Sequence, residues 1–180
     1  MQIKDKCPKF AVKSRISEIM SGKNKLYPLP FETEMVRILN EPPLSFHTPS
    51  FTHFLANKMQ IVKAIKQGLP FAFFELVSRL APFTETEWAE LLNLSTKSLQ
   101  RYRKARNFHF RPAQSERIIE MAEVSSMGIE TFGSQENFKN WLSAPIFALG
   151  GYTPLQLLGH SYGKEMVLAE LNAINHGILA

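Results

Sequence analysis

The chain has 180 residues, of which 44% are hydrophobic, and it carries a formal net charge of +5 at pH 7 with a pI of about 9.4. This length supports one or two domains with a buried core, and the positive charge suits an anionic partner such as nucleic acid without requiring one. A single cysteine, Cys7, excludes an internal disulfide framework and a cysteine-based zinc site. No apolar run is long enough to cross a membrane and the N-terminus lacks the apolar core of a secretory signal, so we expect a cytoplasmic protein.

The first fifty residues are rich in proline and lysine and hold six of the eleven prolines. We interpret residues 1–50 as an arm or linker, with a short helix over residues 31–39 as its only regular element. A basic arm can add phosphate contacts to DNA. A loose leader without a role is the alternative, and it stays open.

Two apolar helices are predicted next. Over residues 51–67 the apolar residues recur at helical intervals, and Gly68 and Pro70 end the helix. A second helix spans residues 71–80, before Pro82. Its aromatic residues Phe71, Phe73 and Phe74 are predicted core, where each buried ring contributes about 1.5–3 kcal/mol. A base-stacking platform is the alternative use of these rings, but a helix this apolar favours the core.

Residues 84–105 predict two short helices joined by a tight corner. Thr84 followed three residues later by Glu87 is a capping box, which starts the first helix. Asn93 falls at the corner, where a left-handed residue is needed and asparagine is tolerated. Ser95 can cap the second helix by accepting a backbone N–H, a contribution of about 1 kcal/mol.

The second of these helices has an apolar side, formed by Leu99 and Tyr102, and a basic side. The polar side chains that could reach phosphates and base edges are Lys97, Ser98, Gln100, Arg101, Arg103 and Lys104. This pattern predicts a helix-turn-helix whose second helix lies in the DNA major groove. An ordinary helical hairpin with a solvated basic face is the alternative. The arginines that follow, at positions 106, 111 and 117, favour DNA.

The rest of the chain is also predicted to be helical. A loop over residues 107–112 leads to a long helix over residues 113–132, with a break expected near Gly128. Ser134 caps the next helix. Gly150 and Gly151 allow a sharp bend. Two further helices follow: a short one that starts at Thr153–Pro154 and is closed by Gly159, and a final one from Ser161 to Gly177.

Catalytic and metal-binding patterns are not found in the sequence. The five histidines, His47, His53, His109, His160 and His176, are scattered without metal-ligand spacing, and His160–Ser161 is only a dipeptide. The pair Gly150–Gly151 is not part of a phosphate-binding loop. We therefore expect no catalytic residue, no metal, no cofactor and no enzyme activity.

The last forty residues carry a distinctive set of tryptophan, leucine, proline and glycine positions. These are Trp141, Leu142, Pro145, Leu149, Gly150, Gly151, Pro154, Leu155, Leu157, Leu158, Gly163 and Gly177. The set resembles the C-terminal toxin-binding domain of the Xre/MbcA/ParS antitoxins. Upstream, the order Lys66–Leu69–Pro70, the helix-turn-helix and Ser115–Arg117–Ile118 resembles the Xre-type domain of the same proteins. The resemblance covers about residues 60–180.

The resemblance implies an all-α protein with an Xre-like helix-turn-helix domain at residues 51–132 and a small toxin-binding domain at residues 133–180. It implies an antitoxin of a type II toxin–antitoxin pair, which binds a RES-domain toxin related to ADP-ribosyltransferases, blocks its NAD pocket and represses its own operon, often as a homodimer. The alternative is a free-standing helix-turn-helix repressor whose C-terminal domain serves dimerisation.

The residues predicted to bind the toxin are Gly150, Gly151, Pro154, Leu158, Gly177, Ile178, Leu179 and Ala180. Ile178 and Leu179 follow a helix stop and precede a free carboxylate, so they could form a small plug for a pocket that is built for an anionic cofactor. The alternative is that Ile178 folds back on the last helical turn.

Overall fold

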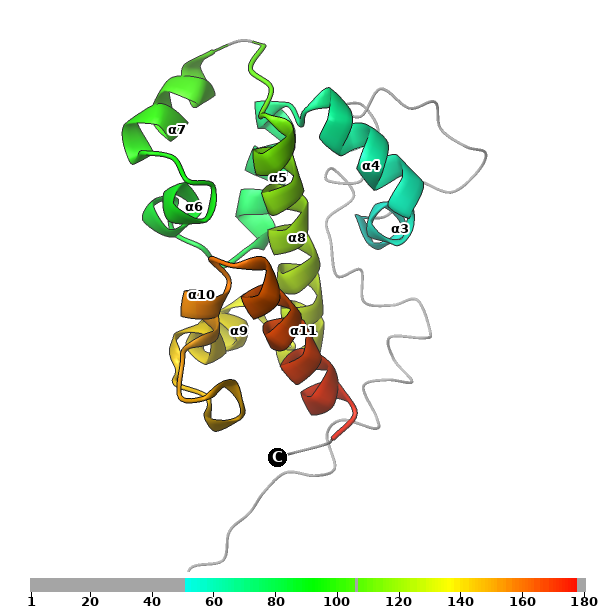
Figure 1. The fold of residues 1–180 in the computed structure, drawn as a ribbon, viewed down its shortest axis with the longest axis vertical. Coiled ribbons are helices and arrows are strands. Elements are labelled where there is room, and N and C mark those ends of the chain that lie inside the picture. Colours follow the sequence, from blue (N-terminus) through cyan, green and yellow to red (C-terminus); the bar gives the residue numbers. More distant parts are fainter. Residues whose placement is uncertain (1–50, 106, 178–180) are drawn as a thin grey trace, which may run out of the picture.

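The computed structural model describes residues 51–105 and 107–177, and nearly all of its regular structure is helical (Figure 1). The elements in chain order are α3 (Phe51–Ala56), α4 (Lys58–Gln67), α5 (Phe71–Leu80), α6 (Glu85–Leu91), α7 (Thr96–Lys104), α8 (Pro112–Phe132), α9 (Gln135–Ser143), the 3-10 turn η1 (Phe147–Leu149), α10 (Pro154–Leu157) and α11 (Ser161–Asn175). The all-α prediction is confirmed. The arm at residues 1–50, with the helix expected over residues 31–39, lies outside the described residues.

The helix predicted over residues 51–67 is in fact two helices, and this prediction was wrong. The break falls at Asn57, whose side chain accepts a hydrogen bond from the Gln60 backbone N–H at 3.2 Å and so caps α4. Not every apolar residue of this stretch is buried: Val62 is 44% exposed, whereas Ala64 is buried.

Helix α8 is the axis of the fold. In Figure 1 it runs through the middle of the molecule, with α3, α4 and α5 packed toward one end and α9 and α11 toward the other. The break predicted at Gly128 is absent, because α8 continues to Phe132. A Cβ atom at Gly128 would overlap the ring of Phe138 in α9. The glycine therefore allows a close helix–helix contact and does not end the helix.

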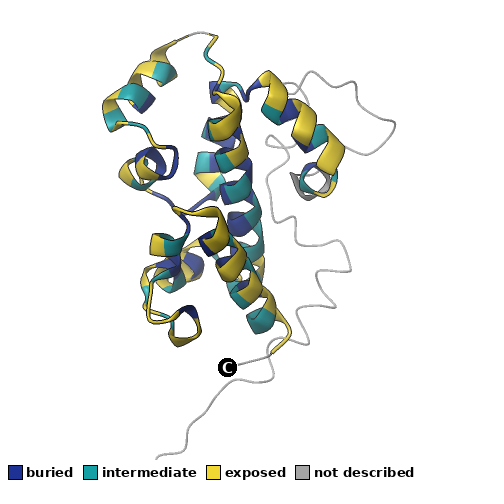
Figure 2. Cartoon of the chain, in the orientation of Figure 1, coloured by how far each residue is buried: buried dark blue, intermediate teal, exposed yellow. Residues whose placement is uncertain are grey.

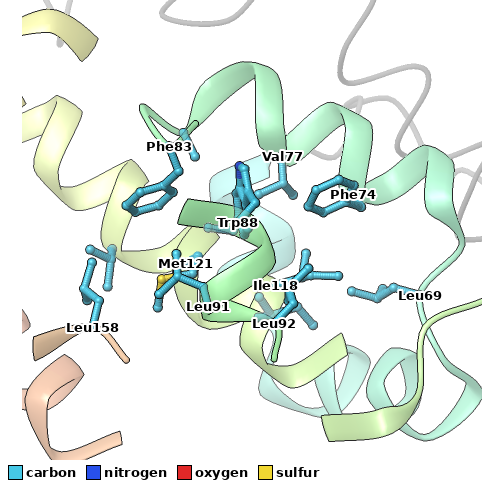
Figure 3. Close-up of a cluster of buried hydrophobic side chains, with 14 of the residues drawn as sticks. Leu69, Phe74, Val77, Phe83, Trp88, Leu91, Leu92, Ile118, Met121 and Leu158 are labelled. Atoms are coloured by element: carbon cyan, nitrogen blue, oxygen red, sulfur yellow. The ribbon is translucent and has the colours of Figure 1, made fainter. Parts of the chain in front are cut away.

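One continuous apolar cluster joins both halves of the molecule (Figure 2). Trp88 of α6 makes edge-on contacts with Phe74 and Phe83, with ring centroids 5.1 and 5.3 Å apart. Figure 3 shows Leu158 of the C-terminal part on the side of this cluster where Met121 of α8 lies. The predicted domain boundary at residue 132 coincides with the end of α8, but the division into two domains stays a prediction.

A short backbone pairing ties the start of α5 to the loop before α8. The Phe110 N–H donates to the Leu69 carbonyl at 2.8 Å, and the Phe71 N–H donates to the Phe108 carbonyl at 3.1 Å. The buried Ser115 hydroxyl accepts from the Leu69 N–H at 2.9 Å and donates to the Phe110 carbonyl at 3.3 Å. This pairing fixes the path by which the chain returns from α7.

Candidate nucleic-acid and partner interfaces

Helices α6 and α7 form the corner that the sequence predicted. The Thr84 N–H donates to the Glu87 carboxylate at 2.6 Å, and the Glu87 N–H donates to the Thr84 hydroxyl at 3.2 Å, so the capping box is confirmed. Asn93 has a φ of 52°, as the corner requires. The Ser95 hydroxyl accepts from the Ser98 N–H at 3.1 Å and caps α7.

One face of α7 is polar and open to solvent. Its exposed side chains are Lys97, Gln100, Arg101 and Lys104, and the opposite side of the helix carries the buried Leu99. At 3.6 residues per turn, these four positions fall within a sector of about 100°. Three cations and one amide on one helix face suit phosphate oxygens and base edges.

The other two residues of the predicted DNA-binding set do not lie on this face. Ser98 is half-buried, and its hydroxyl lies 2.9 Å from the Ser95 hydroxyl, within the helix cap. The Arg103 guanidinium faces two carboxylates of the scaffold, with Nε 4.0 Å from Glu75 and one terminal nitrogen 3.8 Å from Glu85.

The structure describes two of the arginines that follow α7, and they differ in exposure and in hydrogen bonding. Arg111 is exposed just before α8. Arg117 is largely buried and donates to Glu120 at 2.8 Å and to the Gly159 carbonyl at 3.2 Å. It therefore links α8 to the turn before α11. Arg106 lies outside the described residues.

The residues predicted to bind the toxin fall into three groups. Gly150, Gly151 and Gly177 are exposed and adopt positive φ, so the expected bend at residues 150–151 is confirmed. Pro154 and Leu158 are buried, so their side chains have no surface to offer a partner and serve the protein's own core. The remaining three, Ile178, Leu179 and Ala180, lie outside the described residues.

Sequence reasoning missed a set of exposed apolar side chains in the C-terminal part. Phe147 in η1 is 94% exposed and Tyr162 at the start of α11 is 83% exposed. Tyr152 and Met166 are also exposed, and Tyr162 and Met166 lie one helical turn apart. The sequence contained a signal for Tyr162 and Met166, because both lie outside the buried stripe of α11 that Gly163, Val167 and Leu171 form.

A network of charged side chains joins α4, α8 and α11. Lys164 of α11 lies 3.1 Å from Glu120 and 4.0 Å from Glu123, both on α8. Glu123 also pairs with Lys58 of α4 at 3.2 Å. Because Lys164 and Glu120 are each only 17% exposed, this pair is shielded from solvent and holds α11 against α8.

Among residues 51–105 and 107–177, no group of three or more histidine, cysteine or acidic side chains is arranged to hold a metal ion. Within the same ranges, no helix is both long and apolar enough to cross a membrane.

Two family models match the two halves of this fold. The Antitoxin Xre-like helix-turn-helix domain matches residues 60–123, and the Antitoxin Xre/MbcA/ParS C-terminal toxin-binding domain matches residues 127–177. Both models describe domains of antitoxins, so the chain is similar to the Xre/MbcA/ParS antitoxins over these two stretches. The resemblance noted in the sequence is thus supported, and its helix-turn-helix is α6 and α7.

Curated relatives bear antitoxin names. The chain is 26% identical to Antitoxin Xre of Yersinia enterocolitica over 121 residues, and this aligned region covers 67% of this chain and 81% of the relative. It is 26% identical over 123 residues to Antitoxin Xre of Pseudomonas putida, covering 68% and 76%. It is 25% identical over 145 residues to the Prs ADP-ribosylating antitoxin of a Sphingobium species, covering 74% and 91%.

Proposed function

We propose that this protein is an antitoxin that neutralises a RES-domain toxin by direct binding through its C-terminal part, and that it represses its own operon by binding DNA through α7. The observation that carries the first half is the exposure of Phe147, Tyr152, Tyr162 and Met166 within the segment that the toxin-binding family model matches. Exposed aromatic side chains and methionine are enriched in protein–protein interfaces, where a few such anchors supply most of the binding energy.

The chemistry of the toxin is inferred from relatives. The Sphingobium relative bears the name Prs ADP-ribosylating antitoxin, which refers to ADP-ribosylation. RES-domain toxins are related to ADP-ribosyltransferases and use NAD, so a toxin of this class fits both the resemblance and that name. The tripeptide Ile178–Ala180 is proposed to enter the NAD pocket, together with contacts from the surface near Gly150, Gly151 and Gly177.

Co-expression of this protein with the product of a neighbouring RES-domain gene tests the first half. We expect the two to co-purify and NAD consumption to be suppressed. Replacing Phe147 or Tyr162 by alanine should weaken co-purification, because each removes a large exposed ring. Met59→Ala is the matched control, since Met59 is 67% exposed but lies on α4, outside the C-terminal segment. Equal effects at all three positions would contradict the proposed surface.

Deletion of residues 178–180 tests the proposed plug separately. We expect NAD consumption to return while DNA binding persists. Full inhibition by the truncated protein would show that the tail is not needed and would leave the exposed aromatic surface as the inhibitory contact.

DNA binding is proposed for the four exposed polar residues of α7, and a homodimer would place two such helices on a palindromic operator. The α7 face supports this proposal with three cations and one amide. A mobility shift with the upstream DNA of its own gene tests it. Arg101→Gln should lower the salt slope, d log K/d log[salt], by about 0.9 for the lost phosphate contact. An unchanged slope would remove Arg101 from the interface.

The free-standing repressor remains the second candidate, because α7 would serve it equally well. Co-purification separates the two. A repressor whose C-terminal part only dimerises would bind DNA but would not bind a RES-domain protein.

A further inference from the structure

Resting on the proposed DNA binding, we propose that Glu75 and Glu85 hold Arg103 against the scaffold, so that Arg103 positions α7 and does not contact nucleic acid. The two acids come from different helices. Glu75 lies on α5 and its carboxylate is 4.0 Å from Arg103 Nε, while Glu85 lies on α6 and its carboxylate is 3.8 Å from a terminal nitrogen of Arg103. One side chain thus connects the last turn of α7 to both α5 and α6.

The position of Arg103 on the helix agrees with this role. With about 100° of rotation per residue, Arg103 lies about 40° from the buried Leu99 and about 160° from the exposed Arg101. Arg103 therefore borders the side of α7 that packs on the protein. Its side chain is 49% exposed and it lies about 60° from Gln100, at the edge of the face assigned to DNA, so its pairing with the two acids decides where the guanidinium points.

The charges around Arg103 also oppose a phosphate contact. Helix α6 carries Glu85, Glu87 and Glu90 and has no basic residue. One carboxylate oxygen of Glu85 is shielded from solvent and has no hydrogen-bond partner, and Arg103 is the cation that faces it. A phosphate at Arg103 would sit beside the carboxylates of Glu75 and Glu85, where like charges repel. The acids consequently favour the scaffold-bound position of the guanidinium.

The salt dependence of DNA binding distinguishes an orienting arginine from a phosphate ligand. The probe is a mixed-sequence DNA duplex, and the proteins are full-length chains. Arg103→Gln should leave the salt slope of the native background unchanged, whereas the control Arg101→Gln should lower it by about 0.9. In the background Glu75→Gln with Glu85→Gln, Arg103 is released, and Arg103→Gln should then lower the slope by about 0.9.

Two results would overturn the proposal. A drop in slope for Arg103→Gln in the native background, equal to that of Arg101→Gln, would make Arg103 a phosphate ligand. An unchanged slope in both backgrounds would show that the acids do not restrain it.

The melting temperature, measured without DNA, tests the role of Arg103 separately from the proposed DNA binding. If the native chain shows no salt-dependent binding, the proposed DNA binding fails, and the melting temperature alone decides the role of Arg103. Arg103→Gln and the double glutamine variant should each lower Tm by about 1–4 °C, and their combination should lower it no further than the larger single effect. Additive shifts in Tm would show that Arg103 and the two acids act independently, and the proposal would be wrong.

Discussion

Replacing Gly163 by alanine tests the packing that sets the position of α11. A Cβ atom at Gly163 would lie 2.7 Å from the carbonyl carbon and 3.0 Å from the Cα of Leu157, with the Leu157 carbonyl oxygen closer still. These are backbone atoms of α10, so no side-chain rotation can relieve the overlap. Helices α10 and α11 would have to separate by about 0.7 Å for the carbonyl carbon alone to reach ordinary contact at 3.4 Å.

The magnitude follows from two opposing effects. Overpacking of a close contact costs about 1–3 kcal/mol, and the higher helix propensity of alanine returns up to about 1 kcal/mol. The overlap involves rigid backbone, and the fully buried Leu158 and Val167 lie beside it. We therefore expect a net loss of about 1–2 kcal/mol in the free energy of unfolding and a drop in Tm of about 3–8 °C.

Thermal and urea unfolding followed by circular dichroism measures this loss, and Gly159→Ala is the matched control. A Cβ at Gly159 would meet nothing nearer than the Gln156 carbonyl at 3.8 Å, so its effect on stability should stay within about 0.5 kcal/mol. If Gly163→Ala were as stable as the native chain, α10 and α11 would not approach each other closely enough to place a Cβ atom at this position 2.7 Å from the Leu157 carbonyl carbon.

Three further positions probe a buried hydrogen bond, a close helix contact and the corner between α6 and α7. Ser115→Ala should lower the free energy of unfolding by about 1–3 kcal/mol in urea titrations, because the buried Leu69 N–H loses its acceptor. Ser115→Thr keeps the hydroxyl and should lose less stability. An equal loss in both variants would show that this hydrogen bond is not the cause. Gly128→Ala should lower Tm by several degrees by pushing Phe138 out of place, and a higher Tm would refute the close α8–α9 contact. Asn93→Gly should match or exceed native stability and Asn93→Val should reduce it by about 1–2 kcal/mol, since φ is 52°; equal stabilities would contradict the left-handed corner.

Signals confined to one helical turn were readable from the sequence. The capping box of Thr84 and Glu87, the serine cap at Ser95 and the left-handed Asn93 all depend on atoms within about four residues of one another. Such interactions do not depend on how the rest of the chain folds, so the sequence pattern predicts them directly. The position of the helix-turn-helix followed from these local signals together with the spacing of its apolar residues.

Features that depend on distant partners were not readable in the same way. The low helix propensity of Gly128 predicts a helix break, yet α8 is continuous there and packs closely against Phe138. Likewise, Arg103 matches the other cations of α7 in type and spacing, and only the positions of Glu75 and Glu85 direct it toward the scaffold.

The sequence by itself determined the caps, the turn and the all-α class of this protein, because each rests on residue type and short spacing. The tertiary structure decided which polar and apolar side chains face outward. Burial depends on what the other helices cover, so it assigned Leu158 to the core and left Phe147 and Tyr162 exposed.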